Sequence, residues 1–89
     1  MKIKDGFVLE QVGDTYLAVA VGELAEQFNA LVRLNETGAF LWRQLITEKT
    51  KDELLVALMN EYEGVSEELA KRDIISFLNT LKANNILEV

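Results

Sequence analysis

The sequence contains no cysteine, no histidine and no proline among its 89 residues. Without cysteine and histidine, the chain has no disulfide, no thiolate or imidazole metal site, no cysteine nucleophile and no histidine-based catalytic triad. No apolar run approaches the roughly 18 residues that a membrane-spanning helix requires, and the first residues lack the long apolar stretch of a signal peptide. These absences exclude most of the chemistry of small enzymes, and we expect a cytoplasmic protein with no metal, no cofactor and no membrane partner.

Basic residues are also scarce, because nine lysines and arginines face fifteen aspartates and glutamates, which gives a net charge of −6. Nonspecific nucleic-acid affinity requires clustered basic side chains, so we expect no nucleic-acid partner. A glycine-rich phosphate loop is absent, since no two of the five glycines are closer than seven residues. Carboxylate pairs such as Glu67 and Glu68 lie at expected helix starts, where solvated charge explains them better than a metal or glycosidase site.

The length and the apolar content of 49% predict one domain, residues 1–89, with a single hydrophobic core. Residues 7–12 and 15–21 are predicted strands, joined by Gly13 and Asp14 in a type II′ turn. The second of these is apolar on both faces, as expected of a covered strand or of the middle strand of three. Residues 1–5 are polar enough to fray, and residues 22–29 are predicted to form a loop or a helical turn.

The stretch 30–42 organises the rest of the chain, because its apolar pattern changes there from period two to the helical period. Residues 30–34 are predicted to form a half-buried strand, with Leu31 and Arg33 on one face and Ala30, Val32 and Leu34 on the other. Asn35 is expected to cap a central helix that begins at Glu36. Its core residues are predicted to be Leu41, Trp42, Leu45 and Ile46.

Two more helices follow at the expected spacing. A capping box from Thr50 to Glu53 opens the second helix, and Gly64 is expected to end it in the left-handed conformation. Ser66 is expected to cap the third helix, whose core face is Ala70, Ile74, Phe77, Leu78 and Leu81. Three antiparallel strands followed by a bundle of three helices predict an α+β fold of the winged helix-turn-helix type.

Three segments resemble the PqqD family, which is named for a small protein of pyrroloquinoline quinone biosynthesis. These are Leu-Asn-Glu-Thr-Gly-Ala-Phe-Leu-Trp (34–42), Phe-Asn-Ala-Leu-Val (28–32) and Asp-Ile-Ile-Ser-Phe-Leu-Asn-Thr-Leu (73–81). The resemblance extends from about Gly6 to Leu87. The fold of this family recurs as the precursor-peptide recognition element of ribosomal peptide-modifying systems. The family usually has glycine near Asn85, and asparagine also tolerates a positive φ angle there.

The resemblance implies a non-catalytic peptide chaperone that binds the leader of a precursor peptide and presents it to a maturation enzyme, often a radical S-adenosylmethionine protein. The leader would add as an extra strand to the free edge of the third strand, over a groove bordered by the third helix. The expected contact residues are Ala30, Leu31, Val32, Arg33 and Leu34 on the strand and Asp73, Ser76, Phe77 and Thr80 on the helix. Replacing Val32 by proline is expected to remove an edge donor and weaken leader binding.

Other interpretations stay open for some of these residues. Arg33 could pair with a leader carboxylate or simply protect the edge from aggregation. Asp73, Ser76 and Thr80 fit an ordinary solvated helix flank, and Phe77 fits the core. A DNA-binding regulator is disfavoured because its recognition helix would be basic. A winged-helix adaptor with a different partner remains an alternative, and the free edge could also pair with a second copy as a homodimer.

Overall fold

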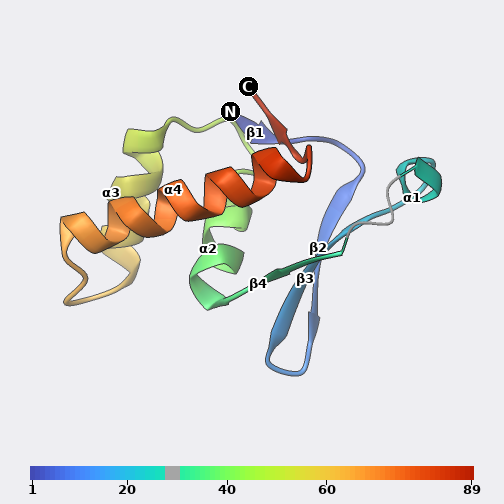
Figure 1. Ribbon diagram of the computed structural model, residues 1–89. Coiled ribbons are helices and arrows are strands. Elements are labelled where there is room, and N and C mark those ends of the chain that lie inside the picture. Colours follow the sequence, from blue (N-terminus) through green and yellow to red (C-terminus); the bar gives the residue numbers. More distant parts are fainter. Residues whose placement is uncertain (28–30) are drawn as a thin grey trace.

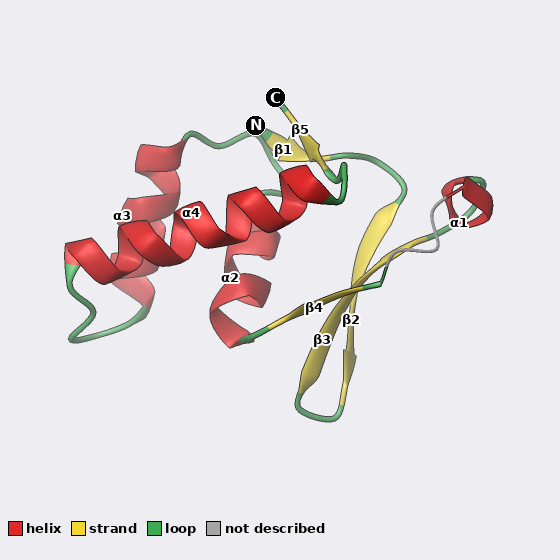
Figure 2. Ribbon diagram, in the orientation of Figure 1, coloured by secondary structure: helices red, strands yellow, loops and turns green. Residues whose placement is uncertain are grey.

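The computed structural model describes residues 1–27 and 31–89 (Figure 1). The elements in chain order are β1 (Lys2–Ile3), β2 (Phe7–Val12), β3 (Thr15–Ala20), α1 (Leu24–Gln27), β4 (Val32–Leu34), α2 (Glu36–Gln44), α3 (Lys51–Glu61), α4 (Glu67–Ala83) and β5 (Leu87–Glu88). Figure 2 shows α2, α3 and α4 gathered to one side of the antiparallel sheet β2-β3-β4. The predicted α+β class is confirmed. Ala30, expected to begin the third strand, lies outside the described residues.

The β2–β3 hairpin has the turn that the sequence predicts. Val12 lies opposite Thr15, so Gly13 and Asp14 form a two-residue loop. Gly13 has a φ of 62°, whereas Asn85 is the one non-glycine residue with positive φ in the described ranges. A positive φ at the first turn position alone is the type II′ pattern. β3 is the middle strand of the sheet, paired with β2 and β4, and α1 forms the predicted helical turn.

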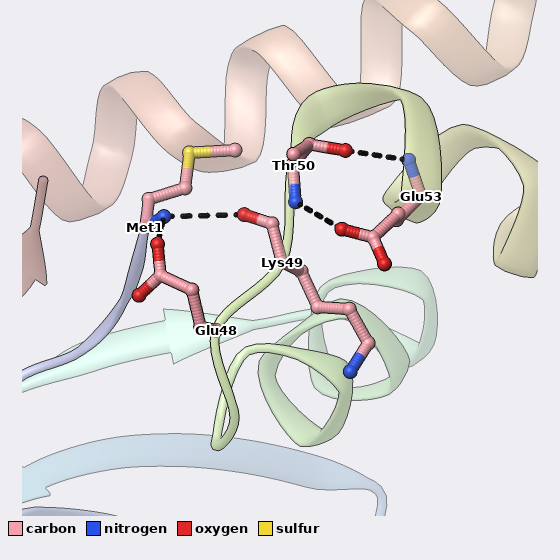
Figure 3. Close-up of polar contacts among 5 residues, drawn as sticks. All are labelled: Met1, Glu48, Lys49, Thr50 and Glu53. Atoms are coloured by element: carbon pink, nitrogen blue, oxygen red, sulfur yellow. Dashed lines mark hydrogen bonds and ion pairs between the residues drawn. The ribbon is translucent and has the colours of Figure 1, made fainter.

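The prediction that residues 1–5 fray is wrong. β1 pairs antiparallel with β5, with Ile3 opposite Leu87, and the two ends of the chain lie side by side (Figure 1). The Ile3 amide donates to the Leu45 carbonyl at 2.9 Å, and the Met1 amino nitrogen contacts the Glu48 carboxylate (Figure 3). These partners are more than forty residues away, so the local sequence pattern carries no sign of them.

The central helix α2 begins as predicted. Asn35 is extended, and its side-chain oxygen accepts from the Gly38 amide at 2.8 Å. Trp42 and Leu45 are almost completely buried, at 2% and 0% exposure. The prediction that Ile46 belongs to the core is wrong, because α2 ends at Gln44 and the Ile46 side chain is 62% exposed.

The last two helices begin with the predicted caps and bury the predicted faces. The Thr50 hydroxyl accepts from the Glu53 amide at 3.1 Å, and the Glu53 carboxylate accepts from the Thr50 amide at 2.9 Å (Figure 3). α3 ends at Glu61, three residues before Gly64, which has a φ of 78°. The buried residues of α4 are Ala70, Ile74, Phe77, Leu78 and Leu81. None of the helices in the described ranges combines the length and the apolar character that a membrane crossing requires.

Candidate functional site

A cleft of about 190 Å³ lies between the end of β4, the start of α2 and one side of α4. We call it the β4–α4 cleft. It is lined by Arg33, Leu34, Asn35, Thr37, Gly38, Leu41, Asp73, Ser76, Phe77 and Thr80. Six of the nine residues predicted to bind a peptide are therefore brought together, although they come from segments about forty residues apart in the sequence. That they bind a peptide remains a prediction.

The other three predicted residues do not line this cleft. Ala30 lies outside the described residues. Leu31 is 60% exposed and does not belong to the core, whereas Val32 is 6% exposed and does belong to it. The structure thus separates the predicted strand residues that it describes into two that line the cleft, Arg33 and Leu34, and two that do not.

Side chains of different character form the floor and the rim of the cleft. The floor consists of the buried apolar residues Leu34, Leu41 and Phe77. The rim carries one negative charge, on Asp73, and Arg33 borders the cleft at the strand edge; both side chains are exposed. Because Phe77 lines the cleft and is also 6% exposed, its two interpretations are compatible. The cleft therefore has an apolar floor that could accept an apolar side chain, with polar groups around it.

The α4 side of the rim also carries two hydroxyl groups. The Thr80 hydroxyl donates to the Ser76 carbonyl at 3.0 Å. This bond uses its only hydrogen, so the Thr80 oxygen faces a ligand as an acceptor. Ser76 and Thr80 lie on the same side of α4 as Asp73, as their helical spacing requires. The α4 wall therefore offers hydrogen-bonding groups along two turns of helix.

Four cleft residues were not among those predicted from the sequence: Asn35, Thr37, Gly38 and Leu41. Gly38 permits the close approach of β4 and α2, since a Cβ atom there would lie 3.3 Å from Leu34 Cβ and 3.2 Å from Asn35 Oδ1. The sequence carries a signal for these positions. A strand that passes directly into a capped helix places the cap and the first helical turn beside the strand end.

The hydrogen-bonding direction of β4 follows from the sheet register. The amide of Val21 donates to the Gly6 carbonyl at 2.8 Å, so the main chain of Val21 is hydrogen-bonded toward β2. In an antiparallel pair this direction alternates from residue to residue. The amides and carbonyls of Tyr16 and Ala18 therefore point away from β2. These two residues pair with Leu34 and Val32. Val32 and Leu34 therefore direct their amides and carbonyls toward β3.

The alternation leaves Arg33 with its amide and carbonyl directed away from β3, toward the outer edge of the sheet. No other strand of the described residues pairs with β4 on that side. The expectation that Val32 provides the edge donor is wrong, because the Val32 amide belongs to the β3–β4 ladder. The edge donor within β4 is Arg33.

Two shallower hollows continue the cleft in both directions. One of about 390 Å³ shares Arg33 and Leu34 with it and reaches Asp14 and Thr15 at the hairpin end. Another of about 550 Å³ shares Ser76 and Thr80 with it and lies along the outer side of α4. The three hollows thus adjoin one another from the β2–β3 turn to α4.

A further hollow, of about 440 Å³, lies elsewhere, between the first part of the chain, β2 and the end of α2. It includes Ile46 and the Tyr16 ring, whose centroid lies 5.7 Å from the Arg43 guanidinium carbon. It contains none of the predicted site residues. Within residues 1–27 and 31–89, no group of three or more carboxylates is placed to hold a metal ion.

Comparison with known proteins identifies the family. Residues 25–87 match the family described as coenzyme PQQ synthesis protein D (PqqD). The chain belongs to the PqqD family. The matched range includes β4, α2 and α4 and therefore every residue of the β4–α4 cleft. No match was found among proteins with curated descriptions.

Two solved structures have a similar fold over nearly the whole chain. TbiB1 in complex with the TbiA(beta) leader peptide superposes with a TM-score of 0.76 at 26% identity, covering 99% of this chain and 95% of that chain. A lasso peptide synthetase B1 complexed with the leader peptide has a TM-score of 0.69 at 22% identity, covering 96% and 93%. The second likeness, at this identity, shows the shared fold alone. Both chains were solved with a leader peptide bound.

Proposed function

We propose that this chain binds the leader of a ribosomally made precursor peptide by strand addition to β4 and presents the peptide to a maturation enzyme. The proposal rests on one observation, which is that the open edge of β4 lies beside the β4–α4 cleft. Arg33 directs its amide and carbonyl outward, and the adjoining β4–α4 cleft has the size of one large side chain or two small ones. Main-chain pairing would supply affinity, and the cleft would supply selectivity.

The sheet geometry specifies how an antiparallel leader strand would lie. The leader residue opposite Arg33 would exchange two main-chain hydrogen bonds with it, and its side chain would lie on the Arg33 face. A carboxylate at this position would meet the guanidinium group. The two neighbouring leader residues would direct their side chains to the face of Val32 and Leu34, which is the side of the cleft. We therefore expect an acidic leader residue flanked by residues that fit an apolar seat.

The partner is proposed to be an enzyme that modifies or cleaves the precursor, and a radical S-adenosylmethionine protein is the class that the family resemblance implies. The chain itself is proposed to contribute affinity and position without chemistry. Two facts support this division. The sequence lacks histidine and cysteine, which carry much of the acid-base and nucleophilic catalysis in small enzymes. TbiB1, the solved relative at 26% identity, is described with a leader peptide.

The experiment is a calorimetric titration with synthetic leader segments from the short open reading frames that flank the gene, with duplex DNA as a control. Two variants separate the side chain from the main chain. Arg33→Ala removes the guanidinium group and keeps the outward amide, whereas Arg33→Pro removes both. We expect the proline variant to bind at least about 10-fold more weakly than the alanine variant, because one main-chain hydrogen bond contributes about 1 kcal/mol and the proline ring obstructs the added strand.

The controls concern folding and charge. Circular dichroism must give the same spectrum for both variants, and leader binding must fall only modestly between low and physiological salt. Equal affinities for the two folded variants would refute strand addition at Arg33. If no flanking leader segment binds, the adaptor alternative takes its place, and a steep salt dependence together with DNA binding would indicate a nucleic-acid partner.

A further inference from the structure

The outer face of the sheet is apolar and lies outside the hydrophobic core. Side chains on a strand alternate between its two faces, and those opposite to the core face are Val8, Glu10 and Val12 on β2, Leu17 and Val19 on β3, and Leu31 and Arg33 at β4. None of these residues belongs to the core cluster. Val8, Val12 and Leu31 are 38%, 60% and 60% exposed. Exposed apolar side chains gathered on one sheet face make that face a candidate interaction surface.

The strand register arranges these side chains in rows across the sheet. Val8 pairs with Val19, and the β3–β4 register continued by one residue places Leu31 on the other side of Val19. In the next row, Leu17 pairs with Glu10 on β2 and with Arg33 on β4. An apolar row is thus followed by a row with an acid at one edge and a guanidinium at the other. Among the described residues, neither of these two charges forms an ion pair.

We propose that a second copy of this chain covers the outer sheet face, related by a two-fold axis that runs parallel to the strands through Leu17. Such an axis places β2 of one copy over β4 of the other. Glu10 then faces Arg33 of the second copy, the reverse pair forms as well, and Leu17 lies on its own equivalent. Val8 faces Leu31 in the apolar row. The charges of the face are self-complementary, as a two-fold interface requires.

The charges also select this axis over the alternative. A two-fold axis in the same plane but perpendicular to the strands would place Glu10 on Glu10 and Arg33 on Arg33, and both contacts would be repulsive. Packed sheets lie about 10 Å apart, a distance that the long Glu and Arg side chains span together. The second copy would lie above the sheet plane, so the outward amide of Arg33 at the β4 edge would stay open.

The size of the face sets the strength of this association. Six residues at about 3.3 Å and three strands at about 4.8 Å give a face of roughly 20 by 14 Å. This is well below the roughly 800 Å² that each partner buries in a stable complex. Self-association is therefore weak, reversible and dependent on concentration. It does not require a leader peptide, and a leader carboxylate bound to the Arg33 guanidinium would compete with it.

The test is sedimentation velocity of the full chain at concentrations up to about 1 mM, at low salt. The unmodified chain is expected to show a dimer that increases with concentration. Glu10→Arg alone and Arg33→Glu alone each place two like-charged pairs in the dimer, so each is expected to raise the dissociation constant at least about 10-fold. An equimolar mixture of the two variants restores both opposite-charge pairs and is expected to restore the dimer.

A matched pair of lysine substitutions checks the apolar row. Val8 and Met59 are both 38% exposed, but Met59 lies on α3, away from the sheet. Val8→Lys is expected to abolish the dimer and Met59→Lys to leave it intact, with circular dichroism to verify that both fold. A monomer at every concentration, or the absence of a dimer in the charge-reversed mixture, overturns the proposal. A dimer that joins through the β4 edge also overturns it, and that dimer would be insensitive to Glu10→Arg and Val8→Lys, because both residues lie on β2 at the opposite side of the sheet.

Discussion

The main-chain alternation in β4 makes a prediction that needs no ligand. Val32→Pro should destabilise the fold strongly, whereas Arg33→Pro, one residue later, should leave its stability almost unchanged. The two positions are neighbours on the same strand, and only the direction of the amide differs. Val32 faces Ala18 of β3, and Arg33 faces the open edge.

The magnitudes follow from what each proline removes. At Val32 the ladder loses one hydrogen bond, about 1 kcal/mol, and the opposing carbonyl of Ala18, a residue 1% exposed, is left without its partner, about 1–3 kcal/mol more. The expected loss beyond Val32→Ala is therefore about 2–4 kcal/mol. At Arg33 the amide faces outward, and an edge strand tolerates proline at such a position. Proline also restricts the unfolded chain, which lowers the entropy cost of folding and offsets part of any strain in the folded state. The expected change beyond Arg33→Ala is within about 1 kcal/mol.

Urea unfolding followed by circular dichroism measures both differences. A small domain has a free energy of unfolding of about 5–15 kcal/mol, so a loss of 2–4 kcal/mol shifts the midpoint clearly. The alanine variants control for the lost side chains, of which Val32 is buried and Arg33 is exposed. Equal losses for the two prolines, or a larger loss at Arg33, would show that the alternation is assigned to the wrong residues.

Two predictions concern titrating groups in the helical part. Hydrogen bonds from Thr50 lower the pKa of the Glu53 carboxyl group. The ionised Glu53 side chain therefore stabilises the fold above about pH 4.5, and this stabilisation disappears as the pH falls through the lowered pKa. Thr50→Ala should lose about 1 kcal/mol at neutral pH and show a flatter decline of stability in acid, measured by urea unfolding at several pH values. Burial, followed by the charges of Glu36 and Glu61, raises the pKa of Tyr62 above 10. The unfolded chain therefore loses this proton at a lower pH than the folded chain, so the stability should fall as the pH rises above 10. Thermal unfolding at several pH values measures this decline. A Tyr62→Phe variant with the same alkaline decline would contradict the assignment to Tyr62.

Local sequence patterns were sufficient for the helix caps and for the hairpin turn. The caps at Asn35, Thr50 and Ser66 were predicted because a cap involves residues three positions apart. The type II′ turn was predicted because it depends on one glycine. The Ile46 prediction failed because helical spacing continued past the true end of α2 at Gln44. The spacing of apolar residues does not mark where a helix ends.

The candidate site was only partly accessible from sequence. Periodicity and the family resemblance located the third strand and the α4 flank, and six of the predicted residues line the β4–α4 cleft. The roles of Val32 and Arg33 were exchanged, because the direction of an amide depends on the whole register from the β2–β3 turn to β4. The pairing of β1 with β5 was missed because it joins the two ends of the chain.

By itself, the sequence determined the α+β class, the order of the main strands and helices, the caps that begin the helices and the family. All of these depend on residue spacing within one element or on a motif. Only the tertiary structure decided that the start of α2 completes the cleft between β4 and α4 and that Arg33 holds the open edge donor. It also decided which face of the sheet carries its apolar and charged rows outside the core. These properties depend on contacts between segments distant in the sequence, and their geometry is set only when the register and the packing of all the elements are fixed together.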